Sequence, residues 1–361
     1  NTTGAYNSAM GRNALNGNTT GDYNTALGVS ALKTASTVDN NTAVGYFSLK
    51  ENTTGTENSA LGSQALAANT TGDANIAIGF EALDANTTGS NNTAVGRSSL
   101  GANTTASDNV AIGYHALKVN TTGTRNTAVG SLALDANTTA NNNTGIGNRS
   151  LSANTTGTQN AALGTYSLEN CTTGGDNTAV GYIALNNANG VQNTAVGSRA
   201  LQDMTTGDDN VAVGYHALHT NTTASDNTAL GSHALYLNTT GADNTAVGTY
   251  ALDANTTASY NTAVGRSALG ANTTGTKNTS VGAYALDANT TADGNTAIGY
   301  EALTSNTTGA NNVALGDRAL DANTTGENNT AVGQHALGAV STSSYNVAVG
   351  QGALYNNTAA N

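Results

Sequence analysis

The residues with the clearest chemical potential are the asparagines of a recurring Asn-Thr-Thr triplet. The triplet occurs 16 times, and each copy has the Asn-x-Thr form of an N-glycosylation acceptor. A structural turn explains the same triplet, because Asn and Thr side chains hydrogen-bond to nearby backbone in bends. The sequence leaves open a structural turn or a face that carries N- or O-linked glycans, with candidate acceptors at Asn18, Asn52, Asn69, Asn86, Asn103, Asn120, Asn137, Asn154, Asn221, Asn238, Asn255, Asn272, Asn289, Asn306 and Asn323.

Replacements of this asparagine indicate which way its side chain faces. Where the triplet is lost, the residue in its place is apolar or small: Ala35, Cys171, Ala188, Met204 and Val340. We therefore expect the position to be turned at least partly inward. Acceptors stacked at roughly 4.8 Å would also crowd one another if all carried glycans.

Metal and calcium sites are poorly supported. The five histidines are His115, His216, His219, His233 and His335, and the pair His216 and His233, one repeat apart, could share a metal ion. No column of Cys or carboxylates completes such a site, so we expect surface histidines and no bound metal. The acidic residues, such as Asp84, Asp108, Asp208 and Asp209, lack the repeated pattern of calcium-binding turns and indicate solvated charge.

Enzymatic chemistry is not indicated. Ser and Thr are so frequent that a chance triad has no meaning, and a Gly-x-Gly-x-x-Gly phosphate loop is missing. We expect no enzyme and no cofactor. An ice-binding solenoid is a remote alternative, because the two threonines of each triplet are adjacent and point to opposite faces. Recurrent tyrosines leave open contacts with sugars or a neighbouring chain, or simple packing between repeats.

A short repeat of nearly constant length positions all of these groups. Asn-Thr-Ala-Val-Gly at Asn41 recurs with variants at 21 anchors, and every spacing is 17 except the 16 between Asn177 and Asn193. Numbering the anchor Asn as position 0, the consensus is Asn-Thr-Ala-Val-Gly-x-x-Ala-Leu-x-x-Asn-Thr-Thr-Gly-x-x. Such a segment is a poor helix but fits one coil of a stack. We predict an all-β fold, a parallel β-solenoid (β-roll or β-helix) of about 21 coils.

Three columns of the repeat never vary: the anchor Asn at 0, the Gly at +4 and the Leu at +8. We assign them to the scaffold. The bulky residues at +1 and +3 should share one face, with Ala at +2 opposite, and stacked Val and Leu columns should form the core. Ala-Leu at +7 and +8 should add a second short strand, and Gly at +4 a turn with positive φ. The expected structural ladder, in which stacked Asn amides bond along the stack, includes Asn41, Asn58, Asn75, Asn92, Gly45, Gly62, Leu49 and Leu66.

The anchor motif resembles the head repeat of the YadA-like trimeric autotransporter adhesins and of related bacterial and phage surface fibres. It is carried by segments such as Asn75-Ile76-Ala77-Ile78-Gly79 and Asn109-Val110-Ala111-Ile112-Gly113. The resemblance covers every repeat, but only through this short motif, and the family repeat is shorter and lacks the Asn-Thr-Thr-Gly turn. It implies a left-handed parallel β-roll, a trimer, and a head that binds matrix or host surfaces.

Composition limits the partners. The formal charge of −12 disfavours nucleic acid, and no apolar run is long enough to predict a membrane span. The chain begins and ends within a repeat, so we expect residues 1–361 to form one continuous repeat domain, a segment of a longer fibre protein. The sequence thus predicts a structural fibre, extracellular or on a cell or virion surface, that self-associates end to end or laterally, with triplets that either carry glycans or serve only as turns. The alternative is an adhesin or a phage-type receptor-binding fibre.

Overall fold

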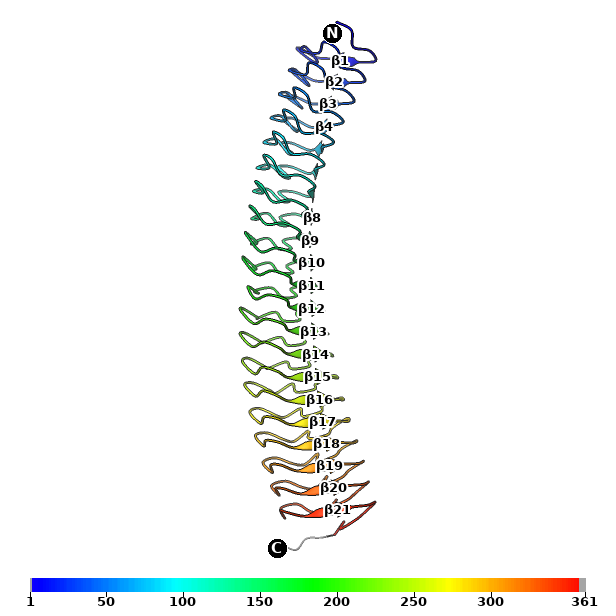
Figure 1. Cartoon of the computed structure of the whole chain (residues 1–361), viewed down its shortest axis with the longest axis vertical. Helices are drawn as coiled ribbons and strands as arrows, with labels where there is room; N and C mark the ends of the chain where they lie inside the picture. Colours follow the sequence, from blue (N-terminus) through cyan, green and yellow to red (C-terminus); the bar gives the residue numbers. More distant parts are fainter. Residues whose placement is uncertain (1, 357–361) are drawn as a thin grey trace. The chain divides into compact units, whose positions relative to one another are not determined.

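Short parallel strands, one in each coil, build the whole described chain. The computed structural model describes residues 2–356, which contain strands of three residues each and no helix. The predicted fold class is confirmed: the chain is an all-β, parallel β-solenoid with 21 strands, each at the same place in its repeat. Figure 1 shows successive coils with their strands stacked one above the next. Residues 1 and 357–361 of the predicted continuous domain lie outside the described residues.

The chain divides into two compact units, Asn1–Ala179 and Val180–Asn361. The strands of the first unit are β1 (Ser8–Met10), β2 (Thr25–Leu27), β3 (Thr42–Val44), β4 (Ser59–Leu61), β5 (Ile76–Ile78), β6 (Thr93–Val95), β7 (Val110–Ile112), β8 (Thr127–Val129), β9 (Thr144–Ile146) and β10 (Ala161–Leu163). Strand β11 (Thr178–Val180) contains the division, which falls in the one coil that is shorter than the others.

The second unit repeats the same arrangement. Its strands are β12 (Thr194–Val196), β13 (Val211–Val213), β14 (Thr228–Leu230), β15 (Thr245–Val247), β16 (Thr262–Val264), β17 (Thr279–Val281), β18 (Thr296–Ile298), β19 (Val313–Leu315), β20 (Thr330–Val332) and β21 (Val347–Val349). In the part of the chain that the structure describes, no helix is long and apolar enough to cross a membrane.

Equivalent residues of neighbouring coils pair in register. Ala43 of β3, for example, faces Ala60 of β4, because the constant period returns each column to the same place. Hydrogen bonds run to both neighbours: the Thr42 amide donates to the Asn58 carbonyl and the Gly45 amide to the Leu27 carbonyl, each at 2.8 Å. The backbone N–H and C=O groups therefore find their hydrogen-bond partners in the neighbouring coils, which an isolated coil would lack.

The strand is followed by a turn that needs left-handed backbone. Gly45 has a φ of 138°, which agrees with the predicted turn at +4. The predicted second strand at +7 and +8 is wrong, because these residues lie in a turn and the invariant leucine is itself left-handed, with a φ of 46° at Leu49. This conformation costs a leucine about 1–2 kcal/mol, which its burial and the bond from its amide to the next coil offset.

The strand faces the opposite way from the prediction. Ala43 is fully buried, whereas Thr42 is exposed and Val44 is partly exposed, so the valine column is not core. The interior is instead filled by Ala at +2, Ala or Ser at +7, Leu at +8 and the two asparagine columns at 0 and +11. A coil this narrow leaves room for only a methyl group beneath the strand, and the larger aliphatic side chains stay outside.

Candidate functional site

The first asparagine column is a buried ladder. Every anchor from Asn24 to Asn329 is at most 1% exposed. The Asn58 amide donates to Oδ1 of Asn41 at 3.0 Å, and Nδ2 of Asn58 donates to the Gly72 carbonyl at 2.8 Å. The side chain of each anchor thus accepts from the backbone amide of the next anchor and donates to a carbonyl 14 residues later, and this accounts for an unvarying Asn without a ligand.

The second column, formed by the Asn-Thr-Thr asparagines, runs parallel to the first. Nδ2 of Asn69 donates to Oδ1 of Asn52 at 3.0 Å and to the Gly72 carbonyl at 2.9 Å. Gly72 thus accepts from Asn58 and from Asn69, so the carbonyl at +14 joins the two ladders. The result is a polar spine inside the solenoid, and not a surface array.

Burial of this spine bears on the candidate glycosylation sites. All 15 asparagines are at most 1% exposed, and each donates from Nδ2 to the carbonyl three residues later. An N-linked glycan on Asn69 would replace one of its two bonded hydrogens and would have to leave a closed interior. The folded coil has no room for this, so the apolar replacements at this column report its orientation correctly.

The two threonines of each triplet play different parts. Oγ1 of Thr70 donates to the Thr87 carbonyl of the next coil at 2.9 Å, whereas Thr71 lies exposed. The adjacent hydroxyls therefore do point to different sides, as expected from their spacing. Within this triplet, Thr71 is the more exposed of the two threonines.

Two interruptions of the second ladder leave unpaired atoms. In this column, Nδ2 of each asparagine donates to Oδ1 of the asparagine in the previous coil. An asparagine therefore lacks this donor when the next coil holds a different residue type at the same position. Oδ1 of Asn154 and of Asn323 are buried without a partner, and the following coils hold Cys171 and Val340 in this column. Burial raises the pKa of the Cys171 thiol to about 11, so it remains a neutral packing group.

A one-coil gap in this ladder gives a testable coupling. Ala35 and Val38 are both fully buried, in columns where most other coils hold Asn and Gly or Ala respectively. A Cβ on Gly55, at the same column as Val38, would lie 2.6 Å from Oδ1 of Asn52, so the two columns share one space. Val38 therefore fills the volume that the short Ala35 side chain leaves.

We expect Ala35→Asn and Val38→Ala each to lower the free energy of unfolding by about 1–3 kcal/mol, through overpacking and cavity formation respectively. The double variant has the same pair of residue types that Asn103 and Ala106 form in another coil. Its new asparagine would also continue the ladder between Asn18 and Asn52. Its loss should be smaller than the sum of the single losses by about 1 kcal/mol or more. Denaturant unfolding of all four proteins measures this, and strict additivity would contradict the shared-space argument.

The outer face of the sheet is uncharged, and its +3 column is aliphatic while its +1 column is mostly threonine. Positions +1 and +3 of all 21 strands hold only Ser, Thr, Ala, Val, Ile, Leu or Met. Leu61 is 51% exposed and Ile78 is 40% exposed, so the column is open to solvent. Contiguous apolar surface of this kind marks interaction sites in soluble proteins.

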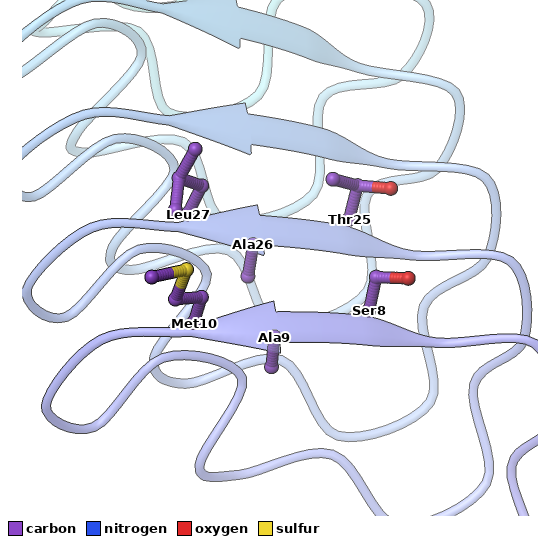
Figure 2. Close-up of a pocket in the computed structure, with 6 residues that line it drawn as sticks. All are labelled: Ser8, Ala9, Met10, Thr25, Ala26 and Leu27. Carbon is purple, nitrogen blue, oxygen red and sulfur yellow. The ribbon is translucent and has the colours of Figure 1, made fainter.

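Figure 2 shows the alternation that produces this face at β1 and β2. The side chains of Met10 and Leu27 lie on one side of the strands and those of Ala9 and Ala26 on the other. A hollow at these strands is lined by Ser8, Ala9, Met10, Thr25, Ala26 and Leu27. Its lining carries no charge and no catalytic group.

The histidines are not all surface residues. His115 stacks on Tyr114 at 3.7 Å between ring centroids, and His335 lies edge-on to Tyr355. His216 is only 8% exposed and stacks on His219 and His233, which corrects the expectation of a surface histidine. Within residues 2–356, no group of three or more His, Cys, Asp or Glu side chains is arranged to hold a metal ion.

Carboxylates at columns +9 and +15 are partly buried or hydrogen-bonded to a neighbouring coil. Partial burial raises the pKa of Asp84, with a further contribution from Glu81, so this group is not a fully solvated charge. At +15, Oδ1 of Asp73 accepts from the Thr56 amide at 2.7 Å and from the Thr56 hydroxyl at 3.2 Å. The side chain caps the backbone of the preceding coil.

Comparison with known proteins adds no assignment. No protein-family model matches the chain, and no curated protein matches it.

Proposed function

We propose that this chain is a segment of a structural fibre, located outside the cell or on a cell or virion surface, whose copies associate laterally through the outer face of the sheet. The single observation that supports this is the uncharged aliphatic column at +3, which repeats in every described coil. A soluble monomer rarely leaves such a surface open.

A second copy is the partner whose spacing fits this face best. Parallel strands repeat at roughly 4.8 Å, so two copies bring equivalent coils into contact at every step. No like charges oppose the contact, because the strands carry none. The resemblance to trimeric fibres favours three copies. The proposal does not include N-linked glycans, since the acceptor asparagines form the interior spine.

Charges placed on the outer face test the proposal. Ile112 and Leu163 are 39% and 41% exposed, so a lysine there is tolerated by the isolated fold. We expect the natural chain to sediment as an assembly and the Ile112→Lys/Leu163→Lys variant as a single chain, because buried ammonium groups oppose the interface. Sedimentation velocity measures the mass of each species.

The matched control places the same charges on another side of the coil. Thr122 and Thr156 are exposed at +13, so Thr122→Lys/Thr156→Lys should leave the assembly intact. A natural chain that stays monomeric at high concentration would overturn lateral association. Dissociation of the control variant would show that added positive charge disrupts the assembly wherever it is placed, and the outer face of the sheet would then not be identified as the interface.

A further inference from the structure

A cluster of histidine and tyrosine rings interrupts the uniform wall of the second unit. The turn columns +6 and +9 face each other. Two successive coils hold aromatic rings at both columns, and the third coil holds one at +6. The cluster, which we call the histidine cluster, consists of Tyr215, His216, His219, His233, Tyr236 and Tyr250.

His216 lies at the centre of the cluster. Its ring centroid is 4.6 Å from that of His219 and 5.4 Å from that of His233, and both pairs are nearly parallel. Tyr215 packs against it at 4.1 Å and Tyr236 at 5.7 Å. Neither ring nitrogen of His216 has a hydrogen-bond partner, and both are buried. The imidazole of His216 is therefore enclosed by rings, and none of them hydrogen-bonds to its nitrogens.

The charged groups around the cluster offer little compensation. Asp203 lies beside His219, with Oδ2 3.6 Å from Nδ1, and Asp253 acts on His233 from the next coil. Arg199 adds a positive charge to His216 and His219 from the preceding coil. Nδ1 of His233 meets the Ser232 hydroxyl at 2.9 Å. Among the described residues, no carboxylate forms an ion pair with His216.

We propose that this segment of the second unit is an acid-sensitive opening point, at which protonation of the stacked imidazoles separates the rings and loosens the turns that carry them. Two adjacent imidazolium rings at 4.6 Å repel each other, and burial weakens the screening by water. The other described coils, which lack adjacent stacked imidazoles at these columns, stay closed. The device is a conformational one and is independent of the proposed lateral association.

The direction of the pH dependence follows from the same surroundings. Burial, followed by the positive charges of His219, His233 and Arg199, lowers the pKa of His216 below its usual 6.5. Burial also lowers the pKa of His219, and Asp203 opposes this only in part. An opened segment therefore binds more protons than a closed one, so closure is most stable above pH 6.5 and weakens as the pH falls below it.

Hydrogen exchange of the full chain tests the proposal. The amides of His216 and Leu218 donate to neighbouring coils at 3.1 and 2.9 Å, and those of His335 and Leu337 make equivalent bonds at 3.0 Å. The second pair is an internal reference for the intrinsic pH dependence of exchange. Between pH 7.5 and 5, opening at the cluster should rise relative to the reference, up to about tenfold per pH unit for each proton taken up.

Serine variants distinguish the cluster from a general acid effect. Serine occupies +6 at Ser267, with the same left-handed backbone, and +9 at Ser152, so the coil accepts it. His216→Ser/His219→Ser should abolish the additional opening, whereas His335→Ser should leave it unchanged. Equal protection at the cluster and the reference in acid, or an acid response that survives the double variant, would overturn the proposal. Titration of the natural chain by NMR gives a second readout, and ordinary midpoints for His216 and His219 would also contradict it.

Discussion

Replacing Gly62 by alanine is expected to open the solenoid at that coil. Gly62 has a φ of 143°, a backbone conformation that L-residues rarely adopt. A Cβ there would contact the Gly79 carbonyl oxygen and would lie 2.7 Å from the carbonyl carbon. Neither atom can move aside, because both belong to the backbone of the next coil. Strain of about 1–3 kcal/mol adds to this overlap, so the total loss should exceed about 3 kcal/mol.

The loss is local in a stacked repeat, where each coil contacts only its neighbours. Hydrogen exchange at the Gly62 and Gly79 amides therefore measures it better than a global melting temperature, which presumes a two-state protein. Gly101→Ala is the matched control in the same unit. A Cβ on Gly101 would come no closer than 3.3 Å to any atom, and alanine stands in the same column at Ala67. Equal protection in both variants would contradict the packing argument.

The period of the sequence was sufficient to predict the fold class. A constant short period with an unvarying Gly and Leu in every repeat leaves few alternatives to stacked coils, and 21 strands appear where the anchors lie. The inward orientation of the second asparagine column was also readable, because Ala35, Cys171, Ala188, Met204 and Val340 replace it and all five are fully buried.

The inside and outside of the strand were assigned wrongly because bulk was taken as a sign of burial. A better signal was the range of sizes within each column. Position +2 accepts only Ala, apart from Gly145 and Ser280, whereas +3 ranges from Val to Met. A strict upper limit on size indicates an enclosed position. At +3, side chains of different size are accommodated because that face of the strand is open to solvent.

Three features could not be predicted from columns alone. Leucines such as Leu66, with a φ of 53°, have a left-handed backbone because the chain must turn there to close a short coil. Leucine has no preference for this conformation, so the residue type does not predict it. The meeting of the two ladders at the Gly72 carbonyl depends on the same path, because it joins asparagines from separate columns. The sequence pairs His216 with His233 one coil apart, but the contacts of these rings with His219 and Tyr236 depend on the turn that places +6 opposite +9.

Replacing Asn75 by alanine is expected to break the interior spine. Oδ1 of Asn75 accepts from the Asn92 amide at 3.0 Å and from Nδ2 of Asn92 at 3.2 Å, and Nδ2 of Asn75 donates to the Gly89 carbonyl at 2.8 Å. The Gly89 carbonyl keeps its bond from Asn86. The Asn92 amide loses its acceptor in a fully buried place, which costs about 1–3 kcal/mol.

The lost bonds and the small cavity add to that penalty, so we expect a total of about 3 kcal/mol. Hydrogen exchange at Asn92 and neighbouring amides measures the change. Asn148→Ala is the matched control, since Asn148 is exposed and its side chain donates to the Ser131 carbonyl at 3.2 Å. It should cost less than about 0.5 kcal/mol. If both variants exchange alike, the buried asparagines fill space without supporting the stack, and the unvarying anchor would need a different physical explanation.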